Sequence, residues 1–271
     1  MITRPNPGLS ELSVTEFLTL SRIGFLPHGL VVGACVFDAG TQYDWVVATG
    51  EVTALSQALR EARAQALRRM RTQARALGAE GVVDVRLKVD HDVWKGARQI
   101  AKFVAIGTAV GFDAAHAPAE LRGAPSLRLA DGAPFVSDLT ASDFAALLRA
   151  GYRPITLAMG ACVYGLDPRE MRRSRDADEE MLGYTQAFFD ARELAMERLQ
   201  QDLFAEHPRG TPDEPLGIVG MSVQEAVYGG GQSAPIVEFT ALGTAIAATA
   251  AGDPRRAAEH PRPVLSVPLD R

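Results

Sequence analysis

The sequence predicts an α+β protein in which one small unit occurs twice in tandem: a short helix, a strand, a long helix and an antiparallel pair of strands. Three observations predict this fold. Residues 7–37 align without a gap with residues 134–164, and 13 of the 31 aligned positions are identical. A long amphipathic run follows each of these segments. After each run come two short stretches in which β-branched residues are frequent.

The alignment extends along most of the chain, so positions in the two halves can be matched. The offset is 127 up to residue 37, 129 in the long helix and 136 in the final pair of strands. Two residues related by these offsets are called counterparts below. The offset changes in segments expected to be loops, where insertions are tolerated. The repeat predicts a first domain at 1–113, a linker at 114–133, a second domain at 134–250 and a C-terminal tail at 251–271.

Each element of the first unit has its own local signal. Thr15 is expected to open the short leading helix, and Gly24 to end it. The apolar run 30–37 predicts a strand, in which Gly33 indicates close approach to another backbone. Apolar residues three or four positions apart predict a helix from residue 53 to 77.

The last two elements are expected to be an antiparallel hairpin with one exposed face. Apolar and charged residues alternate over 83–89, and a second apolar stretch at 103–110 supplies the partner, with a turn at 92–97. A three-stranded sheet covered by one helix has a small core and exposed edges, so association with neighbouring units is expected. The linker and the tail are expected to be mostly extended. Apolar residues in them could add short edge strands to neighbours, namely Leu127, Leu129, Leu265 and Val267.

Composition excludes several classes of protein. The 271 residues carry a net charge of −5, which argues against a general binder of nucleic acid or of anionic membranes. Two cysteines cannot form a disulfide framework, and no apolar stretch is long enough to span a membrane. A soluble cytoplasmic protein is therefore expected. Nucleophile-elbow, phosphate-loop and dinucleotide motifs are absent from the sequence, and Gly229 to Gly231 are interpreted as a hairpin turn.

Several runs of residues resemble the YbjQ family, which is named for heavy-metal binding. They are 58–67, 73–83 and 105–110 in the first half, and 191–198 and 241–246 in the second. The resemblance implies β-α-β-β domains like a dodecin subunit, which assemble into closed rings that are typically pentamers. It favours a ring-forming scaffold or binding module without catalytic activity. A protein that binds a metal or small molecule between subunits is the first alternative, and an enzyme with a site between subunits is the second.

The residues themselves give the metal hypothesis only modest support. Cys35 and Cys162 are counterparts within strands, and no CxxC, HxxH or HExxH motif accompanies them. Small buried hydrophobic residues are the simpler interpretation of both. The alternative is that closure of a ring gathers these thiols into a site for a metal ion. Asp90, His91 and Asp92 could hold a hard cation, although a solvated turn is the simpler reading.

The two long helices differ in charge. Residues 60–75 contain six arginines and one glutamate, whereas residues 190–206 contain five acidic and two basic residues. Two solvated helix faces would explain this difference. The alternative hypothesis is that first units meet second units and that like units repel. An arginine face for RNA is a weaker alternative, because no aromatic residues interleave with the arginines.

Overall fold

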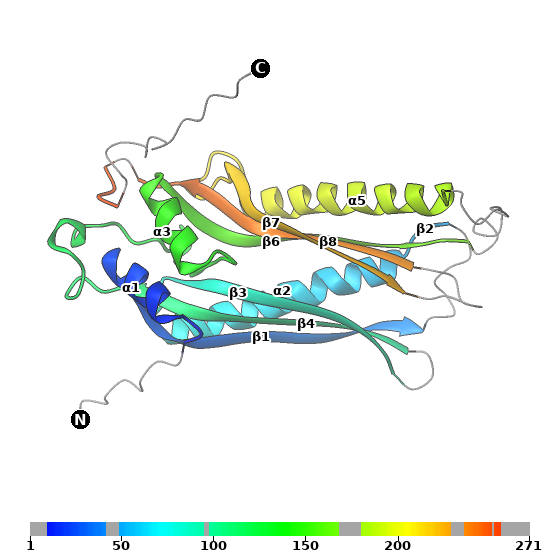
Figure 1. Ribbon diagram of the computed structural model, residues 1–271, viewed down its shortest axis with the longest axis horizontal. Helices are drawn as coiled ribbons and strands as arrows, with labels where there is room; N and C mark the ends of the chain where they lie inside the picture. Colours follow the sequence, from blue (N-terminus) through cyan, green and yellow to red (C-terminus); the bar gives the residue numbers. More distant parts are fainter. Residues whose placement is uncertain are drawn as a thin grey trace, which may run out of the picture.

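The computed structural model describes residues 10–41, 49–94, 98–167, 180–228, 236–250 and 252–255. Over these residues the chain is a mixed α+β structure with two four-stranded sheets, which confirms the predicted fold class (Figure 1). The first sheet has the strand order β1-β4-β3-β5, and the second has the order β2-β6-β8-β7.

The elements follow the order expected for two similar halves. The first half contains α1 (Val14–Arg22), β1 (Phe25–Thr41), β2 (Gly50–Glu51), α2 (Thr53–Ala76), β3 (Gly81–Trp94) and β4 (Arg98–Phe112). The short 3-10 helix η2 (Ala119–Leu121) follows. The second half contains β5 (Phe135–Val136), α3 (Ala141–Arg149), β6 (Tyr152–Gly165), α5 (Leu182–Glu206), β7 (Gly217–Tyr228) and β8 (Ile236–Ala248).

Helix α1 begins at a capping box. The Glu16 backbone N–H donates to the Ser13 hydroxyl, and the Ser13 backbone N–H donates to the Glu16 carboxylate over 2.8 Å. The Ser13 hydroxyl also donates to the Glu16 carboxylate over 2.7 Å, and this bond, followed by the one from the Ser13 backbone N–H, lowers the pKa of Glu16. Thr140 caps α3 in the same way, since its hydroxyl accepts from the backbone N–H of Asp143. Helix α1 therefore begins just before Thr15, the residue predicted to open it.

The long helix α2 matches its predicted bounds closely, and a glycine lets it lie directly on its strand. A Cβ atom added at Gly33 would lie 2.1 Å from the carbonyl oxygen of Ala66, so only glycine fits there. Its counterpart Gly160 lies equally close to α5, where a Cβ would be 1.9 Å from the Ala195 carbonyl oxygen. The predicted close approach at Gly33 is confirmed.

The strands are longer than their apolar patterns predicted. Strand β3 continues to Trp94 and β4 begins at Arg98, so the predicted turn at 92–97 is wrong over residues 92–94. The segment from Asp90 to Asp92 is paired strand, in which His91 lies opposite Ala101, rather than a turn. Ladder hydrogen bonds continue a strand even where side chains do not alternate. Residues 95–97 and the glycine turn at 229–231 lie outside the described residues.

Each sheet gains a short fourth strand from the other half of the chain, so the three-stranded prediction is wrong. Strand β5 pairs in parallel with β3, and β2 pairs antiparallel with β6. An unpaired strand edge exposes backbone hydrogen-bonding groups, and this exchange partly satisfies one edge of each sheet within a single chain.

Four layers are stacked in the order α5, second sheet, α2, first sheet (Figure 1). Helix α2 is enclosed, because it packs on its own sheet and also on the outer face of the second sheet. The core around it accordingly includes Leu157, Met159 and Val163 of β6. In contrast, α5 covers the second sheet on one side and faces away from the chain on the other.

The predicted linker is packed rather than extended. Leu127 and Leu129 are 1% and 7% exposed; Leu127 lies in a cluster with residues of both halves, and Leu129 packs with Ile155 and Ala247 of the second half. They lie in no strand, so the prediction that they add edge strands to neighbours is wrong. Leu265 and Val267 lie outside the described residues. Among the helices that the structure describes, none is long and apolar enough to cross a membrane.

Candidate functional site

The junction between the two halves holds hydrogen bonds between α2 and β6 and ion pairs between the two long helices. At the start of α2, the Val52 backbone N–H donates to the Val163 carbonyl over 2.7 Å. The Val163 backbone N–H donates in turn to the Ser56 hydroxyl over 3.0 Å. These two bonds extend the edge of the second sheet onto the first turn of α2, and they fix the position of the helix along β6.

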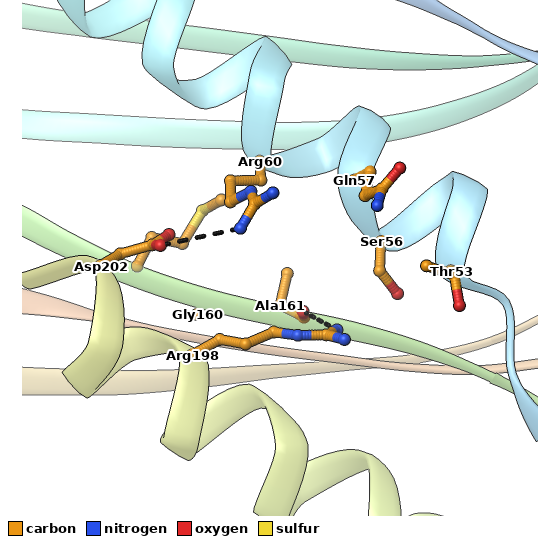
Figure 2. Close-up of a pocket in the computed structure, with 9 residues that line it drawn as sticks. Thr53, Ser56, Gln57, Arg60, Gly160, Ala161, Arg198 and Asp202 are labelled. Carbon is orange, nitrogen blue, oxygen red and sulfur yellow. Dashed lines mark hydrogen bonds and ion pairs between the residues drawn. The ribbon is translucent and has the colours of Figure 1, made fainter. Parts of the chain in front are cut away.

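A buried arginine connects the two long helices. The Arg63 side chain is 5% exposed, and its guanidinium lies 3.7 Å from the Asp202 carboxylate and 3.6 Å from that of Glu206. Arg60 reaches Asp202 over 3.8 Å (Figure 2). The basic face of α2 thus meets the acidic end of α5 within one chain. Buried guanidinium groups require such partners, because desolvation of a lone charge is costly.

A second ion pair lies at the other side of the junction. Arg198 of α5 contacts Glu51 of β2 over 2.6 Å. Its guanidinium also donates to the Ala161 carbonyl over 3.1 Å (Figure 2). Arg69, the counterpart of Arg198, donates to the carbonyl of Ala34, the counterpart of Ala161. Both halves therefore place an arginine from the long helix over the edge of their first long strand.

The cavity at this junction is too small for an ordinary metabolite. It has a volume of about 100 Å³ and is lined by both long helices and β6, including Arg60, Arg198 and Asp202. A second hollow, beside Arg153 and Asp213, has a volume of about 250 Å³. Sites for small organic ligands typically occupy about 300 to 1,000 Å³. Both of these hollows are smaller than that range.

The two predicted metal ligands do not meet within the chain. Cys35 faces α2 in the first core cluster, and Cys162 faces α5 in the second. Burial, followed by the charge of Glu51, raises the pKa of Cys162 to about 12, so its thiol stays protonated. No group of three or more potential ligands occurs among the described residues. The described residues of one chain thus do not bring the two thiols together, and a thiol site formed across chains stays a prediction.

We expect Cys162 to be almost inert in the folded protein. At pH 8 its thiolate fraction should be on the order of a thousandfold lower than in the unfolded chain, so alkylation should slow by a similar factor. The Cys35→Ser variant isolates this thiol, and iodoacetamide labelling followed by mass spectrometry measures the rate. The same variant in urea is the control. Equal rates in the two conditions would show that Cys162 is exposed or ionised.

Counterpart surfaces of the two halves differ sharply in burial. The outer residues Leu157, Met159 and Val163 of β6 are at most 3% exposed, because α2 covers them. Their counterparts on β1 are Leu30, Val32 and Val36, which are 37%, 37% and 59% exposed. The outer face of the first sheet thus has the same apolar pattern as the covered face of β6, but no element of the chain covers it among the described residues.

The complementary surface shows the opposite asymmetry. Val85 of β3 is 4% exposed beneath the second sheet, whereas its counterpart Met221 of β7 is 42% exposed. On α2, Leu55, Leu59 and Leu67 are buried in the core cluster that lies between the two sheets. Their counterparts on α5 are also apolar but only half-buried, namely Tyr184, Phe188 and Met196. One half therefore keeps a contact face on α5 and β7, and the other keeps one on β1.

Sequence reasoning identified the charge contrast of the helices but missed the residues that use it. Arg63, Ser56 and Glu51 carry no motif, and their roles depend on contacts across more than a hundred positions. One signal was present in the sequence: Arg69 and Arg198 are counterparts at the helix offset of 129.

Comparison with known proteins gives two matches. A family model with the description "YbjQ_1: Putative heavy-metal-binding" matches residues 28–113. An encapsulin nanocompartment protein of Mycobacterium tuberculosis is 34% identical over 247 residues, which are 90% of this chain and 87% of the relative. The similarity to this relative therefore extends over both halves of the chain.

Proposed function

Because the chain belongs to the YbjQ family, we propose that it is an assembly module, a scaffold protein whose copies join into a closed ring in the cytoplasm. The proposal includes a tandem duplication, with domains at 1–113 and 134–250 joined by residues 114–133 and followed by a tail at 251–271. The observation that supports it is the uncovered apolar face at each end of the layer stack. Such faces, each matching a covered surface elsewhere in the chain, are typical of a head-to-tail contact.

Ring closure explains why the two uncovered faces differ from one another. A self-complementary dimer would pair one face with itself, whereas a head-to-tail contact joins unlike faces and ends only when the ring closes. The family resemblance gives five as the expected number of chains. Each ring would then hold ten helix-covered sheets in alternating order.

We expect the purified chain to form one species near five times its mass of 29.0 kDa. Native mass spectrometry and light scattering at micromolar concentration would measure this mass. A different closed number would change the stoichiometry but keep the ring. A monomer at this concentration would contradict the proposal, because the apolar faces would then have no partner.

The name of the relative supports a second candidate role. That protein is named as an encapsulin nanocompartment protein, and we propose that this chain also associates with such a compartment. Co-expression with the encapsulin shell protein of the same organism, followed by size-exclusion chromatography, tests the association. Elution of the chain apart from the shell would contradict it.

Metal binding between subunits is the remaining candidate, and the family description is its support. Elemental analysis of protein purified without chelator tests it, with the Cys35→Ser/Cys162→Ser variant as the control. A metal that stays bound in this variant would exclude the thiols as ligands.

A further inference from the structure

We infer that two copies of the chain join through an interface that repeats the junction between the chain's own halves. In it, α5 and β7 of one copy pack on the outer face of β1 and β4 of the next copy. This inference rests on the proposed ring and specifies its contacts. It follows from translating each contact at the internal junction by the repeat offsets and asking whether the counterpart residues can make the same contact.

The apolar residues at the internal junction have apolar counterparts at the proposed interface. Within the chain, Leu55, Leu59 and Leu67 of α2 belong to the core cluster that also contains Leu157, Met159 and Val163 of β6. On α5, Tyr184, Phe188 and Met196 pack on their own core, where Phe188 meets Phe239 edge to face, and their uncovered parts would lie against the exposed Leu30, Val32 and Val36 of β1 in the next copy. Every one of these counterparts is apolar. Covering them would remove the exposed Leu30, Val32 and Val36 of β1 from water.

The backbone contacts at the helix start also translate. Val52 and Ser56 bind the backbone of Val163 within the chain. Their counterparts are Met181 and Thr185, and the counterpart of Val163 is Val36. Thr185 keeps the hydroxyl that Ser56 uses as an acceptor, so the backbone N–H of Val36 in the next copy can donate to it.

The ion pair between Arg198 and Glu51 also has a counterpart pair, with its two residues on different copies. Glu51 translates to Glu180, which directly precedes the first turn of α5 as Glu51 precedes that of α2. Arg198 translates to Arg69, which the Ala34 carbonyl already holds over the edge of β1. Glu180 of one copy is therefore expected to pair with Arg69 of the next.

The β-bulges of the two sheets provide an independent match. Strand β3 is irregular between Val83 and Arg86, and there the backbone N–H groups of Asp84 and Val85 donate to the carbonyls of Leu139 and Ser137 over 2.9 and 3.1 Å. Strand β7 has the same irregularity between residues 219 and 222. Its backbone N–H groups at 220 and 221 would donate to the carbonyls of residues 12 and 10 of the next copy.

The contact at the β7 bulge would also supply a hydrogen-bond partner for the buried hydroxyl of Thr108. Thr244 lies 2.9 Å from the Ser137 hydroxyl and also contacts Asp138. Its counterpart Thr108 is fully buried, yet its hydroxyl has no hydrogen-bond partner among the described residues. Ser10, the counterpart of Ser137, would be held beside Thr108 once β7 of another copy fixes its backbone. Leaving a buried hydroxyl unpaired is costly, so this bond favours assembly.

An aromatic pair completes the match. Phe25 and Phe144 pack edge to face within the chain, with ring centroids 5.3 Å apart. Their counterparts are Tyr152 and Phe17, which are 38% and 40% exposed. In the proposed interface, Phe17 of α1 in one copy packs on Tyr152 of the preceding copy.

The buried ion pairs of Arg63 do not translate. The counterpart of Arg63 is Arg192, but those of Asp202 and Glu206 are Gln73 and Leu77. The contact between copies is therefore more apolar than the junction within a chain, and Arg69 with Glu180 is its principal charge pair. This makes a charge exchange at that pair an informative test.

Four variants test the interface: Arg69→Glu, Glu180→Arg, the two combined, and Arg68→Glu as a control on the exposed face of the same helix. Each single exchange at the pair is expected to raise the concentration at which the assembly dissociates by about tenfold, and the combination to recover most of the loss. Arg68→Glu should change it little. Dilution followed by mass photometry measures dissociation, and circular dichroism confirms that each variant is folded.

Disulfide cross-linking tests the same interface independently, in case a charge variant does not fold. The Phe17→Cys/Tyr152→Cys variant is expected to yield a ladder of linked chains on mild oxidation, whereas Phe17→Cys/Phe204→Cys should not. A wild-type monomer would overturn both the ring and this interface. A wild-type ring that shows neither charge recovery nor cross-linking would overturn the interface alone.

Discussion

Replacing Gly160 with alanine is expected to lower the free energy of unfolding by about 3 kcal/mol, the upper range for overpacking a well-filled core. The new Cβ would lie 1.9 Å from the Ala195 carbonyl oxygen, and the next nearest atoms belong to Leu199 at 2.8 Å. Two of these three neighbours are backbone atoms of α5. The helix itself would have to move off β6, since no side-chain rotation relieves the clash.

Urea unfolding followed by circular dichroism would measure this loss. Gly123→Ala is the matched control, because nothing lies within 4 Å of the added Cβ, and its cost should stay within about 0.5 kcal/mol. Gly33→Ala, which meets the Ala66 carbonyl oxygen at 2.1 Å, should behave like Gly160→Ala. A Gly160→Ala protein as stable as wild type would mean that α5 does not rest on this strand.

Removing both acidic partners of Arg63 is expected to have a comparable effect. The Asp202→Asn/Glu206→Gln variant should lose about 3 kcal/mol at neutral pH, because the buried guanidinium would keep its charge without a counterion. Arg63 itself is 5% exposed, whereas the two carboxylates are 23% and 46% exposed. The penalty therefore arises from the arginine, which water cannot reach.

This asymmetry gives a sharp comparison. Arg63→Met keeps most of the side-chain volume and leaves the carboxylates in contact with water, so it should cost less than removal of the two acids. Glu193→Gln, on the exposed face of α5, is the control for loss of a negative charge and should stay within about 0.5 kcal/mol. If Arg63→Met proved the more damaging variant, the burial of the arginine would not be the source of the cost. Thermal and urea unfolding at neutral pH would measure the order of the three.

Local features of the structure were predictable from the sequence because they depend on neighbouring residues. The periodicity of residues 53–77 gave α2 almost to the residue, and Gly33 within an apolar strand predicted the close approach of a backbone. The strand lengths were underestimated, because backbone pairing continues through residues 90–94 where the side-chain pattern no longer indicates a strand. The packing of Leu127 and Leu129 was also missed, since the surrounding Pro, Gly and Ala residues resemble an extended linker.

The sequence by itself determined the repeated order of elements, the α+β class and the contrast in charge between the two long helices. Only the tertiary structure decided that β2 and β5 cross between the sheets, that Arg63 is buried between two carboxylates, and that matched surfaces are covered on one half and bare on the other. The physical reason is that helix periodicity and caps depend on residues a few positions apart. Strand exchange and burial instead depend on groups more than fifty positions apart, whose meeting no local pattern encodes.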